Sequence, residues 1–401
     1  MRELQGIVEA AEEAERGGKT AILATVVQVE GSAYRRPGAH MLITEDGWRA
    51  GSISGGCLES DLLERARALT EAGQPALVTY NTTDAGDVLL GVGLGCRGVI
   101  RVLVERLAPG RTPDPMAFLR SCLRDRRTGI LATVFRLEGP VSTRVGARLL
   151  LHHDGRVSGD IQDAELTALV EEDARKALAG ERSMSGAYSL QSGAAEVFLE
   201  AIRPPIPLVV FGAGHDAVPI VRLAKELGWH VTVVDGRSAY ATSGRFPSAD
   251  SVVLSLPETM RDRVPLDKET AALVMTHNYL QDRKLLEALL PSPVRYIGVL
   301  GPKSRTDEIL SDLRSERVAW TEEQLARLYA PVGLDIGTEG PEGIALAILA
   351  EIQAVRSNRF GGFLRQRARF SRSFRWWRIS SPRSRWEFLP AAWYSACFCR
   401  N

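Results

Sequence analysis

Two long segments of the chain repeat the same order of apolar and polar positions. Residues 20–58 open on an apolar β-rich run, pass through the turn Asp46-Gly47 and a short strand, and end before a helical pattern. Residues 128–166 follow the same course at a constant offset of 108 positions without a gap, and 17 of the 39 pairs are identical. An Asp-Gly pair between apolar runs is a strong hairpin signal. The pattern therefore predicts two duplicated α+β units within residues 1–200.

The two copies differ most in the loop before their helix. The first copy has Ser54-Gly55-Gly56-Cys57, whereas the second has Gln162-Asp163-Ala164-Glu165. A duplicated fold that keeps its framework and loses one loop indicates that the loop is not needed for folding. We interpret this loop as functional, with simple sequence drift as the alternative.

From residue 206 onward the pattern changes to short buried strands that alternate with helices. A Pro-rich linker at residues 203–207 precedes an apolar strand at 208–211, and further strands are predicted at 230–235, 251–256, 271–275 and 296–300. Strands that alternate with helices favour a parallel, doubly wound sheet. We therefore expect an α/β chain in which the duplicated α+β domain is followed by a parallel-sheet domain over residues 206–358.

The first of these strands runs into a glycine-rich turn, Gly212-Ala-Gly214-His215, which opens a helix. Such glycines let backbone N–H groups approach a pyrophosphate at a helix N-terminus. Asp235 ends the next strand, where a carboxylate would accept hydrogen bonds from ribose hydroxyls. Arg237 lies nearby, so a nucleotide with a phosphate on the ribose 2′ position is also compatible with the sequence. The pattern predicts a Rossmann-like domain that binds a nucleotide such as NAD(P), or one used only for contacts.

Two histidines belong to the same predicted edge of the sheet. His277 follows the strand at 271–275, where doubly wound sheets bind ligands. His215 lies inside the glycine turn. Both are candidate ligand contacts, and ordinary structural histidines are the alternative for each.

Cys57 lies between the Ser54-Gly55-Gly56 turn and an amphipathic helix. The dipole and free N–H groups of a helix start favour a thiolate, and the glycines expose backbone N–H groups to an anion. Arg35 and Arg36 supply guanidinium donors if their loop folds back. The combination predicts a site for a soft metal or an anionic sulfur-bearing ligand. The alternative is a buried cysteine that packs as a small apolar residue.

Cys96 lies in a second glycine-dense turn, residues 91–98. Glycine at this density indicates close approach of the backbone to a ligand or to another segment. Cys57 and Cys96 lack the paired CxxC spacing of structural zinc sites, so we exclude that class of site.

Composition and charge narrow the setting. Five cysteines, no apolar run of membrane-spanning length and a charged N-terminal segment favour a cytoplasmic protein without a disulfide framework or a membrane span. Residues 360–401 hold nine Arg and one Glu, a net charge of +8, so the rest of the chain carries −7. An acidic body argues against bulk nucleic-acid binding. The basic, Trp-rich tail is predicted to be disordered, with RNA or anionic-membrane binding as the alternative.

These motifs resemble the XdhC/CoxI family of molybdenum-cofactor accessory proteins, from about Thr20 to Arg359. The resemblance rests on Gly51-Ser-Ile-Ser-Gly-Gly-Cys-Leu-Glu59, Gly95-Cys96, Phe211-Gly-Ala-Gly-His215, Val234-Asp-Gly-Arg237, Thr276-His277, Tyr296-Ile-Gly-Val-Leu-Gly301 and Gly333-Leu-Asp-Ile-Gly337. The chain departs from the family pattern at Arg97, Gly236 and Pro302-Lys303.

The resemblance implies a chaperone rather than a turnover enzyme, so no catalytic residue is assigned. Such a protein binds molybdenum cofactor and delivers it, sulfurated, to a xanthine dehydrogenase or CO dehydrogenase-type hydroxylase, with a cysteine desulfurase as sulfur donor. The family's cofactor-linked cysteines map onto Cys57 and Cys96, the candidate metal contacts. We also expect a homodimer. Helix 344–355 has broad apolar faces, which suit either a core or a dimer contact.

Two other functions remain open from the residues alone. The glycine turn by itself is compatible with an NAD(P)-dependent oxidoreductase, although no Tyr-Lys or His-Asp catalytic arrangement is evident. The other alternative is a scaffold protein that links the hydroxylase to the sulfur donor and binds no ligand itself.

Overall fold

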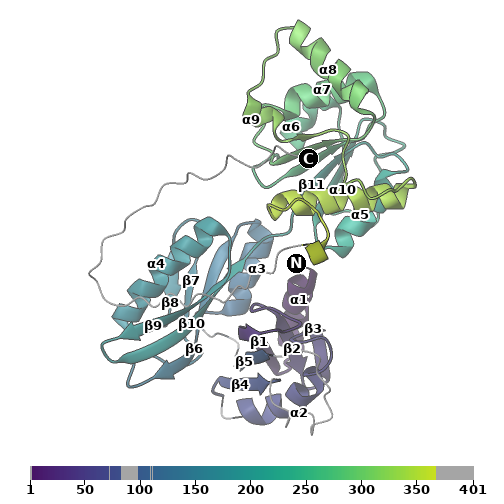
Figure 1. The fold of residues 1–401 in the computed structure, drawn as a ribbon. Coiled ribbons are helices and arrows are strands. Elements are labelled where there is room, and N and C mark those ends of the chain that lie inside the picture. Colours follow the sequence, from purple (N-terminus) through teal and green to yellow (C-terminus); the bar gives the residue numbers. More distant parts are fainter. Residues whose placement is uncertain (1, 72, 83–97, 109, 111, 367–401) are drawn as a thin grey trace.

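The computed structural model describes residues 2–71, 73–82, 98–108, 110 and 112–366, which form three sheets with their helices (Figure 1). Cys96 and most of the basic tail lie outside the described residues. Among the described helices, none combines the length and apolar character needed to cross a membrane.

The first unit is a five-stranded antiparallel sheet in the order β3-β2-β1-β5-β4. Even-numbered positions of β1, such as Ile22 and Ala24, pack beneath α2, whereas Leu23 and Val27 face the second unit. Its elements are α1 (Arg2–Arg16), β1 (Ala21–Gly31), β2 (His40–Thr44), β3 (Gly47–Gly51), α2 (Glu59–Thr70), β4 (Ala76–Asn81) and β5 (Gly98–Leu107).

The second unit repeats this topology, in the order β8-β7-β6-β10-β9. The predicted duplication is confirmed, and it extends beyond the recognised segments to a preceding helix and two following strands. Its elements are α3 (Pro115–Asp125), β6 (Gly129–Glu138), β7 (Arg148–Leu151), β8 (Val157–Gly159), α4 (Ala164–Gly180), β9 (Met184–Leu190) and β10 (Gly193–Ile202).

The two units pack through equivalent faces. Val27 and Phe135 occupy the same position in the repeat, and each lies at a β-bulge of its sheet. Both enter one buried cluster together with Leu103 and Phe198, which also correspond between the copies. The outer faces are covered by α2 and α4. Because equivalent side chains meet, the units are related by an approximate twofold axis.

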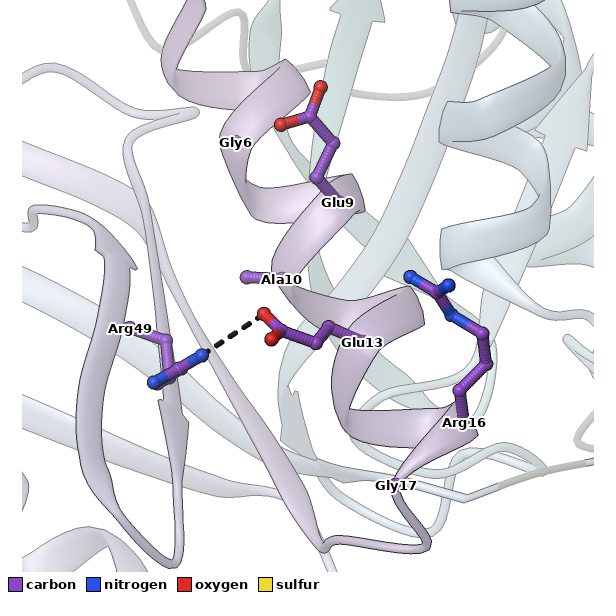
Figure 2. Close-up of a pocket in the computed structure, with 7 residues that line it drawn as sticks. All are labelled: Gly6, Glu9, Ala10, Glu13, Arg16, Gly17 and Arg49. Atoms are coloured by element: carbon purple, nitrogen blue, oxygen red, sulfur yellow. Dashed lines mark hydrogen bonds and ion pairs between the residues drawn. The ribbon is translucent and has the colours of Figure 1, made fainter.

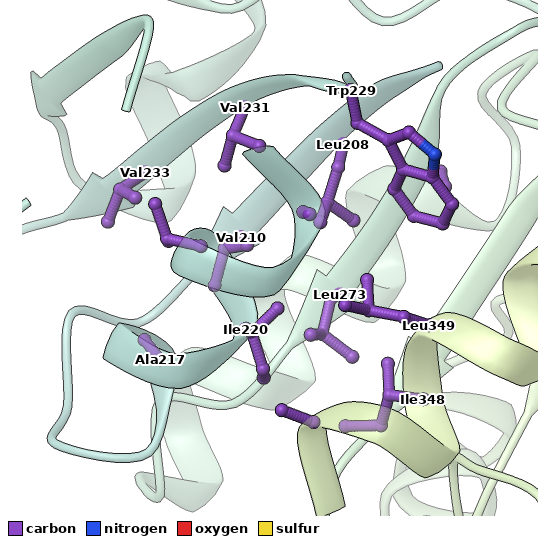
Figure 3. Close-up of a cluster of buried hydrophobic side chains, with 14 of the residues drawn as sticks. Leu208, Val210, Ala217, Ile220, Trp229, Val231, Val233, Leu273, Ile348 and Leu349 are labelled. Atoms are coloured by element: carbon purple, nitrogen blue, oxygen red, sulfur yellow. The ribbon is translucent and has the colours of Figure 1, made fainter. Parts of the chain in front are cut away.

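The third unit is a six-stranded parallel sheet in the order β13-β12-β11-β14-β15-β16. Alternate residues of β11 enter opposite cores. Leu208 and Val210 pack under α5 and α10 (Figure 3). Val209 and Phe211 pack under the helices on the other face. This arrangement confirms the predicted Rossmann-like doubly wound sheet. The strand order reverses between β11 and β14, which is where such sheets bind ligands.

The elements of the third unit are β11 (Pro207–Phe211), α5 (Ala217–Glu226), β12 (His230–Asp235), β13 (Ser251–Leu254), η2 (Pro257–Thr259), α6 (Met260–Arg263), β14 (Ala271–Val274), α7 (Tyr279–Leu289), β15 (Tyr296–Val299), α8 (Lys303–Ser315), α9 (Glu322–Leu325), β16 (Leu328–Tyr329), α10 (Pro341–Arg356) and η3 (Leu364–Gln366). Helices α5 and α10 lie on the side that faces the first two units (Figure 1). Gly228, after α5, lies directly against Arg2 at the start of α1.

Candidate functional site

The turn before α2 presents Cys57 at the surface. The thiol is free and exposed. Ser54, which is buried, accepts hydrogen bonds at Oγ from the N–H groups of Cys57 and Leu58, both at 3.1 Å. The backbone beneath the thiol is therefore fixed by a side chain of the same turn.

A buried carboxylate from α2 closes this turn. Glu59 Oε1 accepts hydrogen bonds from Ser52 Oγ at 2.7 Å, the Ile53 N–H at 3.1 Å and the Ser54 N–H at 2.8 Å. Its Oε2 accepts from the Gly56 N–H at 3.0 Å and from the Ser54 hydroxyl. Burial alone would raise the pKa of Glu59, but these hydrogen bonds lower the pKa to about 2.

This network corrects one expectation from the sequence. We expected the N–H groups around Gly55 and Gly56 to be open to an outside anion or to the thiol of Cys57. Several of them are instead bound to Glu59 and Ser54, because the first turn of α2 brings a carboxylate back to the loop that precedes it. The Glu59 carboxylate thus occupies several of the donors that we expected an outside anion to use, while the Cys57 thiol is exposed at the surface.

The loop between β1 and β2 folds back over the turn through Tyr34. A Cβ added to Gly55 would lie 3.1 Å from Tyr34 Cδ1, so the ring rests on the glycine. Tyr34 is nevertheless 79% exposed. Arg36 is also exposed and forms no side-chain hydrogen bond or ion pair with the described residues. Arg35 instead pairs with Glu3 of α1.

Arg35 lines a cavity of about 520 Å³ where the three units meet. Polar and charged side chains from all three units contribute to its wall, among them Glu3, His40, Glu200, Arg203 and Arg356. The structure therefore places Arg35 at this junction and Arg36 at the surface, so the two predicted cationic donors do not act as a pair.

Two buried ion pairs cross between the repeats near this junction. His40 Nε2 lies 2.8 Å from Glu200, and Arg148 pairs with Glu105. His40 and Arg148 are equivalent in the repeat, as are Glu105 and Glu200. Burial would lower the pKa of His40, but the neighbouring Glu200 carboxylate outweighs it and raises the pKa. The second hydrogen bond of the ring, 3.1 Å from Nδ1, is to Thr25.

A separate cavity of about 600 Å³ runs along the outer side of α1 (Figure 2). Its wall consists of small residues and charged side chains, and Arg49 reaches across to Glu13 at 3.0 Å. None of the predicted site residues lines it.

The predicted nucleotide crevice forms at the carboxyl ends of β11, β12 and β14. Gly212 has φ of +116°, and a Cβ there would lie 2.4 Å from the Met275 carbonyl oxygen, so only glycine fits. The Asp235 carboxylate accepts from the Ala213 N–H at 2.8 Å and from Arg237 through its N–H, Nε and one terminal nitrogen at 2.8, 2.9 and 2.7 Å. Burial would raise the pKa of Asp235, but these donors hold it below its usual value.

An ion pair spans the same crevice. His277 Nε2 lies 2.7 Å from Asp216, which stands at the start of α5. His277 has φ of +58°, a left-handed conformation that is costly for a residue with a side chain. His215 is exposed. The glycine turn and the end of β14 are thus joined by side chains at the point where the strand order reverses.

Sequence profiles of known families match both halves of the chain. The profile of the XdhC and CoxI family matches residues 14–81 and 122–188. The profile of the XdhC Rossmann domain matches residues 208–352. The chain belongs to the XdhC and CoxI family.

Relatives of this XdhC family chain cover nearly its whole described length. A probable xanthine dehydrogenase subunit of Bacillus subtilis (strain 168) is 35% identical over 84% of the chain and 93% of its own length. The "Molybdenum cofactor insertion chaperone PaoD" of Escherichia coli (strain K12) is 24% identical over 87% of the chain and 88% of its own length. A crystal structure of a xanthine dehydrogenase from Bacillus halodurans is 27% identical, with a TM-score of 0.71 over 90% of this chain and 98% of that one.

The predicted residues fall into two groups in different units. Ser54, Gly55, Gly56 and Cys57 form the turn of the first unit, and Gly212, Gly214, His215, Asp235, Arg237 and His277 surround the crevice of the third. Within the described residues, no three His, Cys, Asp or Glu side chains are arranged to hold a metal ion.

Three further residues emerge only from the structure. Tyr34 and Glu59 shape the cysteine turn, and Asp216 binds His277. The sequence held one usable signal: the second repeat has Ser142 and Thr167 at the positions of Tyr34 and Glu59, so both change together with the cysteine loop.

Proposed function

We propose that this XdhC family chain is a non-catalytic chaperone that binds molybdenum cofactor, supports its sulfuration and assists its insertion into a xanthine dehydrogenase or CO dehydrogenase-type hydroxylase. The observation that carries this proposal is an exposed Cys57 thiol on a turn that its own side chains already hold in shape. Family membership and the cofactor-insertion chaperone among its relatives support the same role.

The chemistry of the turn fits an anionic molybdenum–pterin cargo. A thiolate is a suitable soft ligand for the metal, and a guanidinium such as that of Arg36 suits a phosphate. The exposed ring of Tyr34 offers a flat face beside the thiol. Cys96 is the second proposed metal contact. Because Cys57 lies at the surface, a cargo held there remains accessible to the protein that receives it.

The proposal includes partners. A cysteine desulfurase would supply the sulfur, and the molybdenum hydroxylase would receive the cofactor in the cytoplasm. We propose a homodimer. Helix α10 packs its apolar face, with Ile348 and Leu349, into the core of the third unit and leaves Leu346 56% exposed as a candidate contact. The acidic body disfavours nucleic acid as a partner.

Co-expression with cofactor-synthesis enzymes tests the cysteine. We expect the purified wild-type protein to retain molybdenum and pterin, measured by elemental analysis and by fluorescence of the oxidised pterin. Cys57→Ala should lose both and leave the target hydroxylase inactive, whereas Glu165→Ala, at the equivalent position of the second repeat, should behave as wild type. Full cofactor retention and reconstitution by Cys57→Ala would overturn the proposal.

We also propose that the crevice around Gly212 and Asp235 binds a nucleotide such as NAD(P). Family membership favours a binding role over an oxidoreductase. Turnover of NAD(P)H with a small-molecule acceptor, abolished by Asp235→Ala, would support the oxidoreductase instead.

A further inference from the structure

The carboxylate that would recognise a plain ribose is already engaged. Each oxygen of Asp235 accepts two hydrogen bonds. Oδ1 accepts from the backbone N–H and the Nε of Arg237, and Oδ2 accepts from the Ala213 N–H and a terminal nitrogen of Arg237. The residue is only 6% exposed. A ribose 2′-hydroxyl donates a hydrogen bond to such a carboxylate in nucleotide sites that select an unmodified ribose. Here that hydroxyl would have to displace a two-pronged guanidinium contact.

Two guanidinium groups lie where the ribose would be. The Arg237 guanidinium carbon is 4.0 Å from the centre of the Tyr240 ring, and that of Arg245 is 4.9 Å from the same centre. Arg245 also donates to the Ala213 carbonyl oxygen in the glycine turn, at 3.2 Å. The Arg237 side chain is 46% exposed, so it keeps a face and a terminal nitrogen for a ligand.

Arg245 carries an unsatisfied donor. Its Nε is buried and has no hydrogen-bond partner among the described residues. A buried donor without an acceptor is costly. An anion whose oxygen reaches the Arg245 Nε–H would satisfy it. Tyr240 thus packs against two guanidinium groups beside the glycine turn, and Asp235 binds that of Arg237. The second carboxylate at this turn, Asp216, pairs with His277.

An apolar wall lies next to these cations. Leu256 is 53% exposed, and a Cβ added to Gly236 would be 2.7 Å from Leu256 Cδ2, so the leucine covers the backbone just after β12. The cleft beside it, lined by Asp235, Gly236, Ser255 and Pro257, has a volume of only about 10 Å³, so a ligand ring would lie over the exposed leucine and not inside the cleft. A flat purine ring is the part of a nucleotide that such a wall suits.

We propose that the crevice selects an adenosine nucleotide that carries a phosphate on the ribose 2′ position, recognised by Arg237 and Arg245. The inference rests on the proposed nucleotide site and specifies its ligand. A phosphate dianion needs donors where a hydroxyl needs an acceptor, and the residues around Asp235 offer donors. Asp235 serves as the positioning residue that holds Arg237 for the ligand.

Titration calorimetry of the full chain with 2′,5′-ADP, 3′,5′-ADP and 5′-ADP tests this selectivity. We expect 2′,5′-ADP to bind at least about tenfold more tightly than the other two, as charge-assisted contacts to a phosphate should provide. Arg237→Ala should bring the affinities for 2′,5′-ADP and 5′-ADP close together, because it removes a phosphate donor and frees the Asp235 carboxylate. Arg245→Ala should reduce the difference in affinity between 2′,5′-ADP and 5′-ADP and leave the hydrogen bonds of Asp235 to Arg237 in place. Arg314→Ala, an exposed arginine at the end of α8, is the matched control and should leave the ratio unchanged.

The outcomes separate this inference from the proposal beneath it. Equal affinity for 2′,5′-ADP and 5′-ADP, or a preference for 3′,5′-ADP, would overturn the 2′-phosphate assignment and leave a nucleotide site. An unchanged ratio in both Arg237→Ala and Arg245→Ala would also overturn it. No binding of any of the three by the wild-type protein would overturn the nucleotide site together with this inference. The cofactor-retention experiment on Cys57 is independent of all these results.

Discussion

In the first repeat the turn before α2 carries Cys57 and is held by Glu59. In the second repeat α4 begins three aligned positions earlier, so Glu165 lies in its first turn and Asp163 is its N-cap. Asp163 accepts a hydrogen bond from the Leu166 N–H at 2.9 Å, as an ordinary N-cap of α4. Both turns begin helices that cover equivalent sheets. A simple cap is therefore enough for folding, and the larger network around Glu59 must serve something else.

The repeats differ at 22 of the 39 aligned positions, and several of these differences surround the cysteine turn. Tyr34, Gly55, Cys57 and Glu59 correspond to Ser142, Asp163, Glu165 and Thr167. In the first repeat these four residues are neighbours in space. Sheet positions such as Thr25 and Thr133 are unchanged. The four positions around the cysteine turn are those at which we predict a site that the second repeat lacks.

The largest effect is expected from the buried Arg148–Glu105 pair between the two repeats. Arg148→Ala should lower the free energy of unfolding by about 3–5 kcal/mol, because it leaves the Glu105 carboxylate buried opposite a cavity. Urea denaturation measures this. His40→Ala, at the equivalent position, should cost less, since Glu200 lines the junction cavity and can reach water there. The double variant Arg148→Met/Glu105→Leu should recover most of the loss, and an Arg148→Ala protein as stable as wild type would contradict the account.

Glu59→Ala should have the next largest effect. It leaves the N–H groups of Ile53, Ser54 and Gly56 without their acceptor, at a cost of about 1–3 kcal/mol. The turn should also lose its fixed shape, which mass spectrometry of Cys57 alkylation would report as a changed labelling rate. Thr167→Ala in the second repeat is the control and should leave that rate unchanged. Equal effects of the two substitutions would remove the functional distinction between the repeats.

The His40–Glu200 pair predicts a pH dependence that the equivalent Arg148–Glu105 pair lacks. Because the folded-state pKa of His40 is raised above its unfolded value near 6.5, the pair contributes fully below that pH, and its contribution is lost as pH rises through the folded pKa. Each unit of separation between the two pKa values corresponds to about 1.4 kcal/mol. His40→Arg, which copies Arg148, should flatten the dependence of the urea midpoint between pH 6 and 9. If the urea midpoint of the wild-type protein depends on pH in the same way as that of His40→Arg, the His40–Glu200 pair does not cause the pH dependence of stability.

Tyr34→Ala should have the smallest effect on stability, within about 0.5 kcal/mol, since the side chain is 79% exposed and the second repeat folds with Ser142 in its place. If the ring contacts the proposed cargo, the variant should retain less molybdenum and pterin than wild type, and Tyr34→Phe should retain the wild-type amount. Ser142→Ala provides the matched control. Unchanged retention in Tyr34→Ala would confine the site to the turn itself.

The sequence predicted the sheets best, because there a repeated pattern of apolar and polar positions reflects how the strands pack. The offset of 108 positions predicted the duplicated sheets, and alternation of strands with helices predicted the parallel one. The position of Cys57 next to a helix start was also readable. The sequence did not show that the Glu59 carboxylate binds the N–H groups of this turn. The path of the backbone decides whether that side chain reaches back to Ser54 or points to solvent.

Long-range pairs were hidden for a related reason. Arg148 and Glu105 are 43 positions apart, and neither has a local pattern that names its partner. Only the register of the repeats links them to His40 and Glu200, through the equivalence of β2 with β7 and of β5 with β10. The engagement of Asp235 by Arg237 likewise depends on a backbone turn that the glycine motif does not specify.

The internal carboxylate at Glu59 has a consequence for how a guest would come and go. A loop that must be ordered by its ligand loses conformational entropy on every capture and relaxes on every departure. Glu59 keeps the N–H donors of the cysteine turn satisfied within the turn itself. If a guest binds at the Cys57 sulfur as proposed, its arrival and departure would not require the backbone of the turn to reorder, which suits a carrier that must release what it takes up.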